Sequence, residues 1–134
     1  MSEISDEVKK DCEGLVYLRW SLFDSKDSVG SGYRFMEKEP VRILDEVIRL
    51  TKSRWIANNI ILGYTSKPIA DKLRLATTSP HRTGHAVRIR VVGSEKRGKI
   101  VKALHTLGVR RIGIAKDFVY FDTDLTLKPM LSLM

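Results

Sequence analysis

The side chains best suited to chemistry lie in three separate segments of the 134-residue chain. Acids, serines and glycines crowd residues 23–32, two histidines fall in 77–85, and a tyrosine and two aspartates fall in 118–124. Imidazoles and carboxylates bind metals and transfer protons. The single cysteine, Cys12, excludes an internal disulfide and a multi-cysteine zinc site, and its helical spacing with apolar neighbours predicts a buried structural thiol.

The net positive charge of the chain comes entirely from its second half. Residues 1–67 hold 11 basic and 11 acidic side chains, whereas residues 68–134 hold 13 basic and 5 acidic ones and so carry the whole net charge of +8. Such a block suits nucleic acid or an acidic protein surface, and it equally suits a solvated face. The candidate basic face comprises Lys72, Arg74, Arg82, Arg88, Arg90, Lys96, Arg97, Lys99, Lys102, Arg110 and Arg111.

Apolar spacing predicts a single α+β domain over 1–134, with a small antiparallel sheet flanked by helices. The expected helices are 4–16, 40–53, 67–76 and 94–107, and the expected strands are 57–62, 86–92, 110–115 and 118–123. The apolar tail, 125–134, is expected to pack on its own core or to dock on a neighbour. The acidic, polar N-terminus predicts no signal peptide, and no apolar run is long enough to predict a transmembrane segment.

Three segments in order resemble the zinc D-Ala-D-Ala carboxypeptidase and endopeptidase family, in its small phage-type form. FDSKDSVGSGYRFM (23–36) resembles the family's entry motif, SPHRTGHAVRIRV (79–91) resembles its first zinc motif, and GVRRIGIAKDFVYFDTD (108–124) resembles its final strands. The resemblance covers about residues 23–124. It implies a Hedgehog/DD-peptidase-like fold, with zinc held by His, Asp and His around an activated water.

Carried over position by position, the resemblance implies a degenerate site that lacks two zinc ligands. His81 stands at the first ligand, but Arg88 and Tyr120 stand at the second and third. Asp117 falls at the general-base position, and Thr65 replaces the arginine that grips the substrate carboxylate. A fixed cation at position 88 opposes Zn²⁺ binding, and a phenol with a pKa of about 10 is a poor ligand. We therefore expect no bound cofactor and no catalysis.

Two arrangements of this degenerate site are conceivable from the sequence. Our working hypothesis is an ion pair between Arg88 and either Asp117 or Asp122, with Tyr120 hydrogen-bonded to His81, which would plug the old cavity. The other arrangement is a rebuilt metal site from His81, His85 and Asp122.

Three functions follow as expectations. The first is a non-catalytic pseudoenzyme that serves as a phage virion structural protein, either a capsid decoration or cement protein or a tail component, made in the host cytoplasm. It would dock on other virion or assembly proteins or on further copies of itself as a homo-oligomer, and it would not bind a membrane. The second is an active peptidoglycan metallopeptidase that binds zinc through unusual ligands. The third is a basic nucleic-acid-binding protein.

Overall fold

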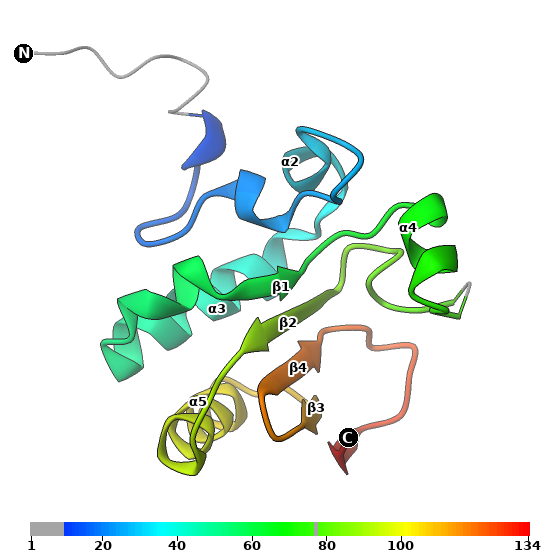
Figure 1. Cartoon of the computed structure of the whole chain (residues 1–134). Helices are drawn as coiled ribbons and strands as arrows, with labels where there is room; N and C mark the ends of the chain where they lie inside the picture. The colour runs from blue at the N-terminus through cyan, green and yellow to red at the C-terminus, as the bar shows by residue number, and fades with distance from the viewer. Residues whose placement is uncertain (1–9, 77) are drawn as a thin grey trace, which may run out of the picture.

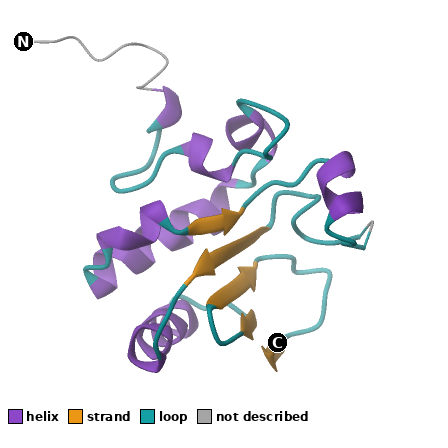
Figure 2. Ribbon diagram, in the orientation of Figure 1, coloured by secondary structure: helices purple, strands orange, loops and turns teal. Residues whose placement is uncertain are grey.

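Five strands form one open sheet in the computed structural model, which describes residues 10–76 and 78–134 (Figures 1 and 2). The strands are β1 (Ile60–Leu62), β2 (Ala86–Arg90), β3 (Arg111–Ile114), β4 (Phe118–Asp122) and β5 (Met130–Leu133). Their order in the sheet is β1-β2-β4-β3-β5. The pairs are antiparallel except for β3 and β5, which run parallel. The α+β class is therefore confirmed, but the expectation of a wholly antiparallel sheet is wrong at β5.

Two long helices pack against each other and against the sheet. They are α3 (Lys38–Thr51) and α5 (Ser94–Thr106), and both agree with the predicted ranges to within two residues. The short elements are α2 (Ser31–Phe35), α4 (Lys67–Lys72) and the 3-10 turns η1 (Trp20–Phe23) and η2 (Arg54–Asn58). Pro40 lies in the first turn of helix α3. Backbone N–H groups in a first turn have no helical acceptor, so the N–H that proline lacks costs the helix no hydrogen bond.

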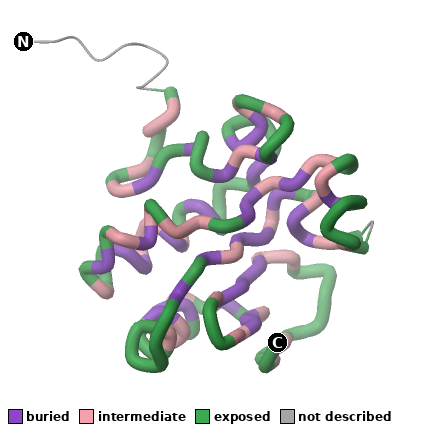
Figure 3. Tube along the Cα trace, in the orientation of Figure 1, coloured by how far each residue is buried: buried purple, intermediate pink, exposed green. Residues whose placement is uncertain are grey.

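The hydrophobic core lies between these two helices and one face of the sheet. Its fully buried side chains recur at helical spacing in α3 and α5 and at alternate positions in the strands, as amphipathic elements require. Figure 3 shows this alternation of buried and exposed positions along the chain. The principal members are Val41, Leu44, Val47, Ile48, Val87, Ile89, Ile100, Leu104, Val119 and Phe121.

The register of β2 against β4 decides which residues share the opposite face of the sheet. Arg88 pairs with Tyr120, and the flanking pairs are Arg90 with Phe118 and Ala86 with Asp122. Because side chains alternate along a strand, these residues point away from the face on which Val119 and Phe121 enter the core. All the strand residues that the family resemblance singles out therefore fall on one face.

The 78–85 loop reaches this face because Gly84 locks it against the segment after α2. Gly84 has a φ of +79°, and a Cβ added there would lie 2.0 Å from the carbonyl oxygen of Phe35. The Gly84 carbonyl also accepts a hydrogen bond of 2.9 Å from the Glu37 N–H. Only glycine permits both this backbone conformation and this close approach.

Four local predictions need correction. The helix expected over 67–76 ends at Lys72, where α4 stops. Residues 54–58 form the turn η2, so the strand expected over 57–62 shrinks to β1, Ile60–Leu62. The helix expected over 4–16 lies partly outside the described residues, and within them helical structure covers only residues 10–11. A turn follows, and Cys12 is half-buried rather than buried, because the chain departs from the helical path that would have carried it into the core.

Candidate functional site

His81, Arg88 and Tyr120 come together on the face of the sheet opposite the long helices. Arg88 and Tyr120 are paired across β2 and β4. The ring of His81, from the 78–85 loop, meets the ring of Tyr120 edge to face with centroids 5.5 Å apart. We call His81, Arg88, Tyr120 and Asp122 the vestigial centre, after the degenerate zinc site that the resemblance implies. Two segments that are far apart in the sequence, 78–90 and β4, thus meet at one point.

His81 is buried and held as a neutral imidazole. Its Nδ1 lies 3.0 Å from the carbonyl oxygen of Gly63. A carbonyl only accepts, so we assign the proton to Nδ1, which leaves a bare lone pair on Nε2. Burial lowers the pKa of His81 to about 4, and the nearby Arg88 cation acts in the same direction, while the Gly63 hydrogen bond and Asp122 oppose the shift.

Tyr120, Asp122 and Arg111 form a connected hydrogen-bonded group. The Tyr120 hydroxyl donates to Asp122 Oδ2 at 2.6 Å, and Arg111 Nε lies 2.9 Å from both carboxylate oxygens. The Asp122 side chain is completely buried, and that of Arg111 is only 16% exposed. Burial, and secondly the bond to Asp122, raise the pKa of Tyr120, so its phenol stays protonated and is not a zinc ligand at neutral pH.

The ion pair expected between Arg88 and either Asp117 or Asp122 is wrong, because Arg88 forms no ion pair among the described residues. Asp122 pairs with Arg111, which stands directly opposite it in the β3–β4 register. The Arg88 guanidinium instead lies over the Phe118 ring, 4.7 Å from its centroid, as a cation–π contact. Burial lowers the pKa of Arg88. The hydrogen bond expected between Tyr120 and His81 is replaced by the contact between their rings.

The resemblance also singles out Thr65 and Asp117, and these two residues lie apart from each other. Thr65 is buried beside the vestigial centre, where its N–H donates to the His81 carbonyl at 3.0 Å and its own carbonyl accepts from Arg82 Nη1 at 3.3 Å. Asp117 is exposed in the β3–β4 turn. Among the described residues, no hydrogen bond or ion pair reaches its carboxylate, so the structure does not position it as a base.

Buried polar atoms without a partner concentrate at this site. In residues 10–76 and 78–134 they are Thr65 Oγ1, His81 Nε2, Arg88 Nε and Thr123 Oγ1. Three of these four, Thr65, His81 and Arg88, stand at positions that the resemblance assigns to ligands or substrate contact. Unpaired buried polar atoms are costly, so their gathering at one place is unusual for a purely structural region.

The residues present do not fit a catalytic zinc ion. Zinc needs three protein ligands and an open position, and this centre offers one free lone pair, on His81. The Asp122 carboxylate is committed to Arg111 and Tyr120, and the Arg88 cation would repel the metal. Within the described part of the chain, no cluster of three or more His, Cys, Asp or Glu side chains could hold a metal. His85 bonds Thr83 through Nδ1 rather than joining His81.

The neutral state of His81 makes stability depend on pH in a defined window. Because its folded pKa of about 4 lies below the ordinary 6.5, only the unfolded chain gains a proton as the pH falls from 6.5 towards 4. The free energy of unfolding should then fall by roughly 3 kcal/mol across that window and level off below it. Urea unfolding at successive pH values measures this fall. His81→Asn, which keeps a donor for Gly63, should flatten the curve, whereas His105→Gln on the exposed side of α5 should leave it unchanged.

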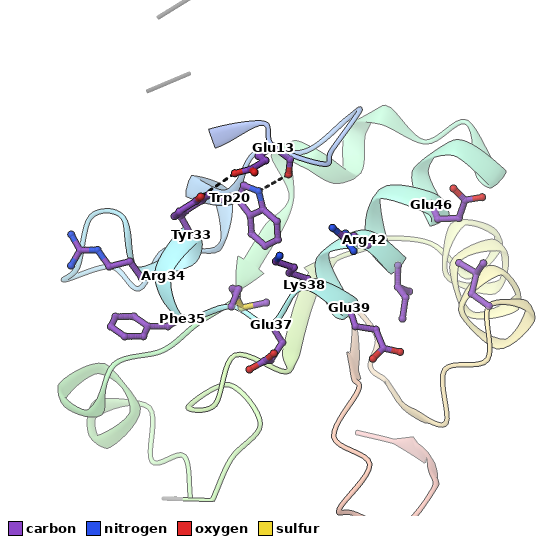
Figure 4. Close-up of a pocket in the computed structure, with 13 residues that line it drawn as sticks. Glu13, Trp20, Tyr33, Arg34, Phe35, Glu37, Lys38, Glu39, Arg42 and Glu46 are labelled. Carbon is purple, nitrogen blue, oxygen red and sulfur yellow. Dashed lines mark hydrogen bonds between the residues drawn. The ribbon is translucent and has the colours of Figure 1, made fainter. Parts of the chain in front are cut away.

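A large cleft lies elsewhere. It has a volume of about 890 Å³ and is lined by residues of α2, α3 and the preceding segment. Figure 4 shows Glu13 within it, accepting hydrogen bonds from Tyr33 through its carboxylate and from Trp20 through its carbonyl. Acidic and basic side chains both line this cleft, and no member of the vestigial centre does. Size alone therefore does not identify the site.

The candidate basic face is divided by the fold. Lys72, Arg74 and Arg82 lie on α4 and in the loop after it, while Lys96, Arg97, Lys99 and Lys102 lie on α5. Arg111 and Arg88 are engaged within the sheet, as described above. Three cations that are not part of the candidate basic face lie near the α5 group, because Lys96 covers Trp55 and Arg97 bonds the carbonyl of the β3–β4 turn. They are Lys52, Arg54 and Lys116.

Comparisons with protein-family models, curated proteins and solved structures found no match. Among the described residues, no helix is both long and apolar enough to cross a membrane.

Proposed function

We propose that this chain is a non-catalytic descendant of the zinc D-Ala-D-Ala peptidases that keeps their Hedgehog/DD-peptidase-like fold and serves as a phage virion structural protein. The observation that carries the proposal is the meeting of His81, Arg88 and Tyr120 at one point. The resemblance assigns these three positions to the three zinc ligands, and two of them now hold side chains that oppose metal binding. A capsid decoration protein or a tail component needs a stable fold that can bind its neighbours, and it does not need a bound zinc ion or catalysis.

The apolar end of the chain supports a docking role. Strand β5 is at the edge of the sheet, and Leu131 and Leu133 are 75% and 86% exposed. The N–H groups of Met130 and Met134 bond inward to β3, so by alternation the backbone groups of Leu131 and Leu133 face outward. An exposed apolar edge without charge or bulge readily accepts another strand.

The occupant that we propose for this edge is β5 of a second copy. In an antiparallel pair centred on Ser132, Leu131 of each copy would face Leu133 of the other. Residues 130–133 carry no charge, so the two strands would not repel each other locally despite the net charge of +8. Such a pair is isologous and closes on itself, as the two-fold interfaces of most homodimers do. The same edge would then serve contacts between neighbouring subunits of an assembly.

Sedimentation analysis over a wide range of concentration tests this docking role. The wild-type chain should dimerise, and Leu131→Glu with Leu133→Glu should remain monomeric while unfolding at the wild-type midpoint, because both side chains are exposed. Val16→Glu with Leu125→Glu introduces the same charges at exposed apolar positions outside β5 and should still dimerise. A monomeric wild type, or equal loss in both double variants, would reject β5 as the interface.

The catalytic alternative makes opposite predictions for the wild-type chain. An active peptidase would carry about one zinc per chain and cleave peptidoglycan. Our proposal expects neither, even when zinc is supplied during purification.

A further inference from the structure

A cluster of seven basic side chains gathers at one end of the molecule from five separate parts of the chain. We call it the basic end. Its members are Lys52, Arg54, Arg90, Lys96, Arg97, Lys99 and Lys116. They come from the C-terminal end of α3, η2, the end of β2, the start of α5 and the β3–β4 turn, which lie together in Figure 1.

Specific contacts hold these parts together. Lys96 of α5 lies over the Trp55 ring of η2, 5.0 Å from its centroid. The Arg90 N–H donates to the Asn59 carbonyl at 2.7 Å, and Arg97 Nη1 donates to the Lys116 carbonyl. The cations are therefore placed by the fold and do not merely share a basic stretch of sequence.

Little acidic charge offsets the basic end. Residues 52–54, 90–99 and 116–117 include only two acids, Glu95 and Asp117. Glu95 and Lys99 are 3.9 Å apart and largely exposed, so water screens this pair. All seven cations are exposed except Arg97, which is half-buried. The N-terminus of the 13-residue α5 adds its partial positive charge to a surface that is already basic.

The makeup of this surface favours a phosphate backbone over an acidic protein. Protein interfaces have an apolar or aromatic centre and are depleted in lysine. Here four of the seven cations are lysines, Val92 is the large exposed apolar side chain on these segments, and Lys96 covers the Trp55 ring. Interfaces with nucleic acids are polar, wet and strongly positive.

We propose that the basic end binds nucleic acid through its phosphates, without reading the base sequence. Long, exposed lysine and arginine side chains suit phosphate contacts, which position a protein but carry no sequence information. Strand β5 carries none of these cations, and it lies at the opposite edge of the sheet from β1. A chain could therefore pair through β5 and still hold nucleic acid at its basic end.

Two charge-reversal variants with identical net charge test the proposal against short duplexes of unrelated sequence. Arg90→Glu, Lys99→Glu and Lys116→Glu alter the basic end. Lys67→Glu, Lys72→Glu and Lys128→Glu alter exposed lysines elsewhere, and either triple variant changes the net charge from +8 to +2. Wild type should bind with a steep salt dependence. The first variant should lose at least about tenfold in affinity and reduce the slope of log K against log salt by about 3, whereas the second should stay near wild type.

Three results would overturn the proposal. The first is an equal loss of affinity in both variants, which would mean that binding responds to net charge alone. The second is binding of poly-L-glutamate as tight as that of the duplex, which would mean an acidic protein partner. The third is an absence of salt-dependent binding to the duplex. Circular dichroism and unfolding midpoints establish that both variants are folded before binding is measured. Failure here leaves the dimerisation test of β5 unaffected.

Discussion

The double variant Arg88→Asp with Tyr120→His is expected to bind one Zn²⁺ per chain, where the wild-type chain binds none. Residues 88 and 120 are direct partners across β2 and β4, and the His81 ring already contacts the side chain at position 120. The two changes supply a carboxylate and a second imidazole beside the free Nε2 lone pair of His81, which completes the ligand set of a catalytic zinc site. Elemental analysis after dialysis and competition with a zinc-sensitive dye measure stoichiometry and affinity.

A matched control uses the next pair on the same face of the sheet. Arg90→Asp with Phe118→His changes an arginine and an aromatic residue on the same two strands and the same face, but two residues farther along each strand from the pair at 88 and 120. It should bind no zinc tightly. Each single variant should bind weakly at best, because two ligands do not hold the metal. If the double variant at 88 and 120 takes up no more zinc than this control, the assignment of these positions to the old ligands is wrong.

Asp122→Asn is expected to be among the most destabilising isosteric changes in the chain, at a cost of about 3 kcal/mol in the free energy of unfolding. The carboxylate is completely buried and neutralises Arg111, so its loss leaves a poorly solvated guanidinium without a counter-charge. It also accepts hydrogen bonds from the Tyr120 hydroxyl and from the Asp124 N–H. Urea unfolding at neutral pH measures the loss.

Asp124→Asn provides the matched comparison for this effect. Asp124 is two residues away, but its carboxylate bonds only within its own turn, to Thr126, so removing its charge should cost less than 1 kcal/mol. Arg111→Met added to Asp122→Asn should recover part of the loss, since removing both charges relieves the unpaired cation. A cost for Asp122→Asn no larger than that for Asp124→Asn would mean that the buried pair contributes little.

Elements with a strong apolar period could be predicted from the sequence because a single face decides them. Helix α3 repeats buried residues at helical spacing from Val41 to Ile48, and β2 alternates buried residues with arginines, so both were located nearly to their ends. The proximity of His81, Arg88 and Tyr120 was instead predicted from the resemblance of three motifs to those of a known family. No local pattern links position 81 to position 120, and their proximity depends on the register of β2 with β4.

The partner of Asp122 could not be predicted because it depends on register across another strand pair. Arg88 and Arg111 are both basic residues on strands that adjoin β4, and only the β3–β4 pairing places Arg111 opposite Asp122. Likewise β5 carries no alternating pattern: MLSL is apolar on both sides, and its pairing with β3 is a long-range choice. The strand expected over 57–62 is longer than β1 because Ala57 and Asn58 belong to the turn η2.

The parallel pairing of β5 with β3 imposes an order on folding. Strands β3 and β4 are joined by a tight turn and can pair early in folding, because closing so short a loop costs little conformational entropy. Strand β5 can form only on an already ordered β3, after residues 123–129 have carried the chain past it. Strand β5 is thus the last strand of the sheet to form. The surface proposed for dimerisation becomes available only when the other strands are already paired and cannot form non-native pairs.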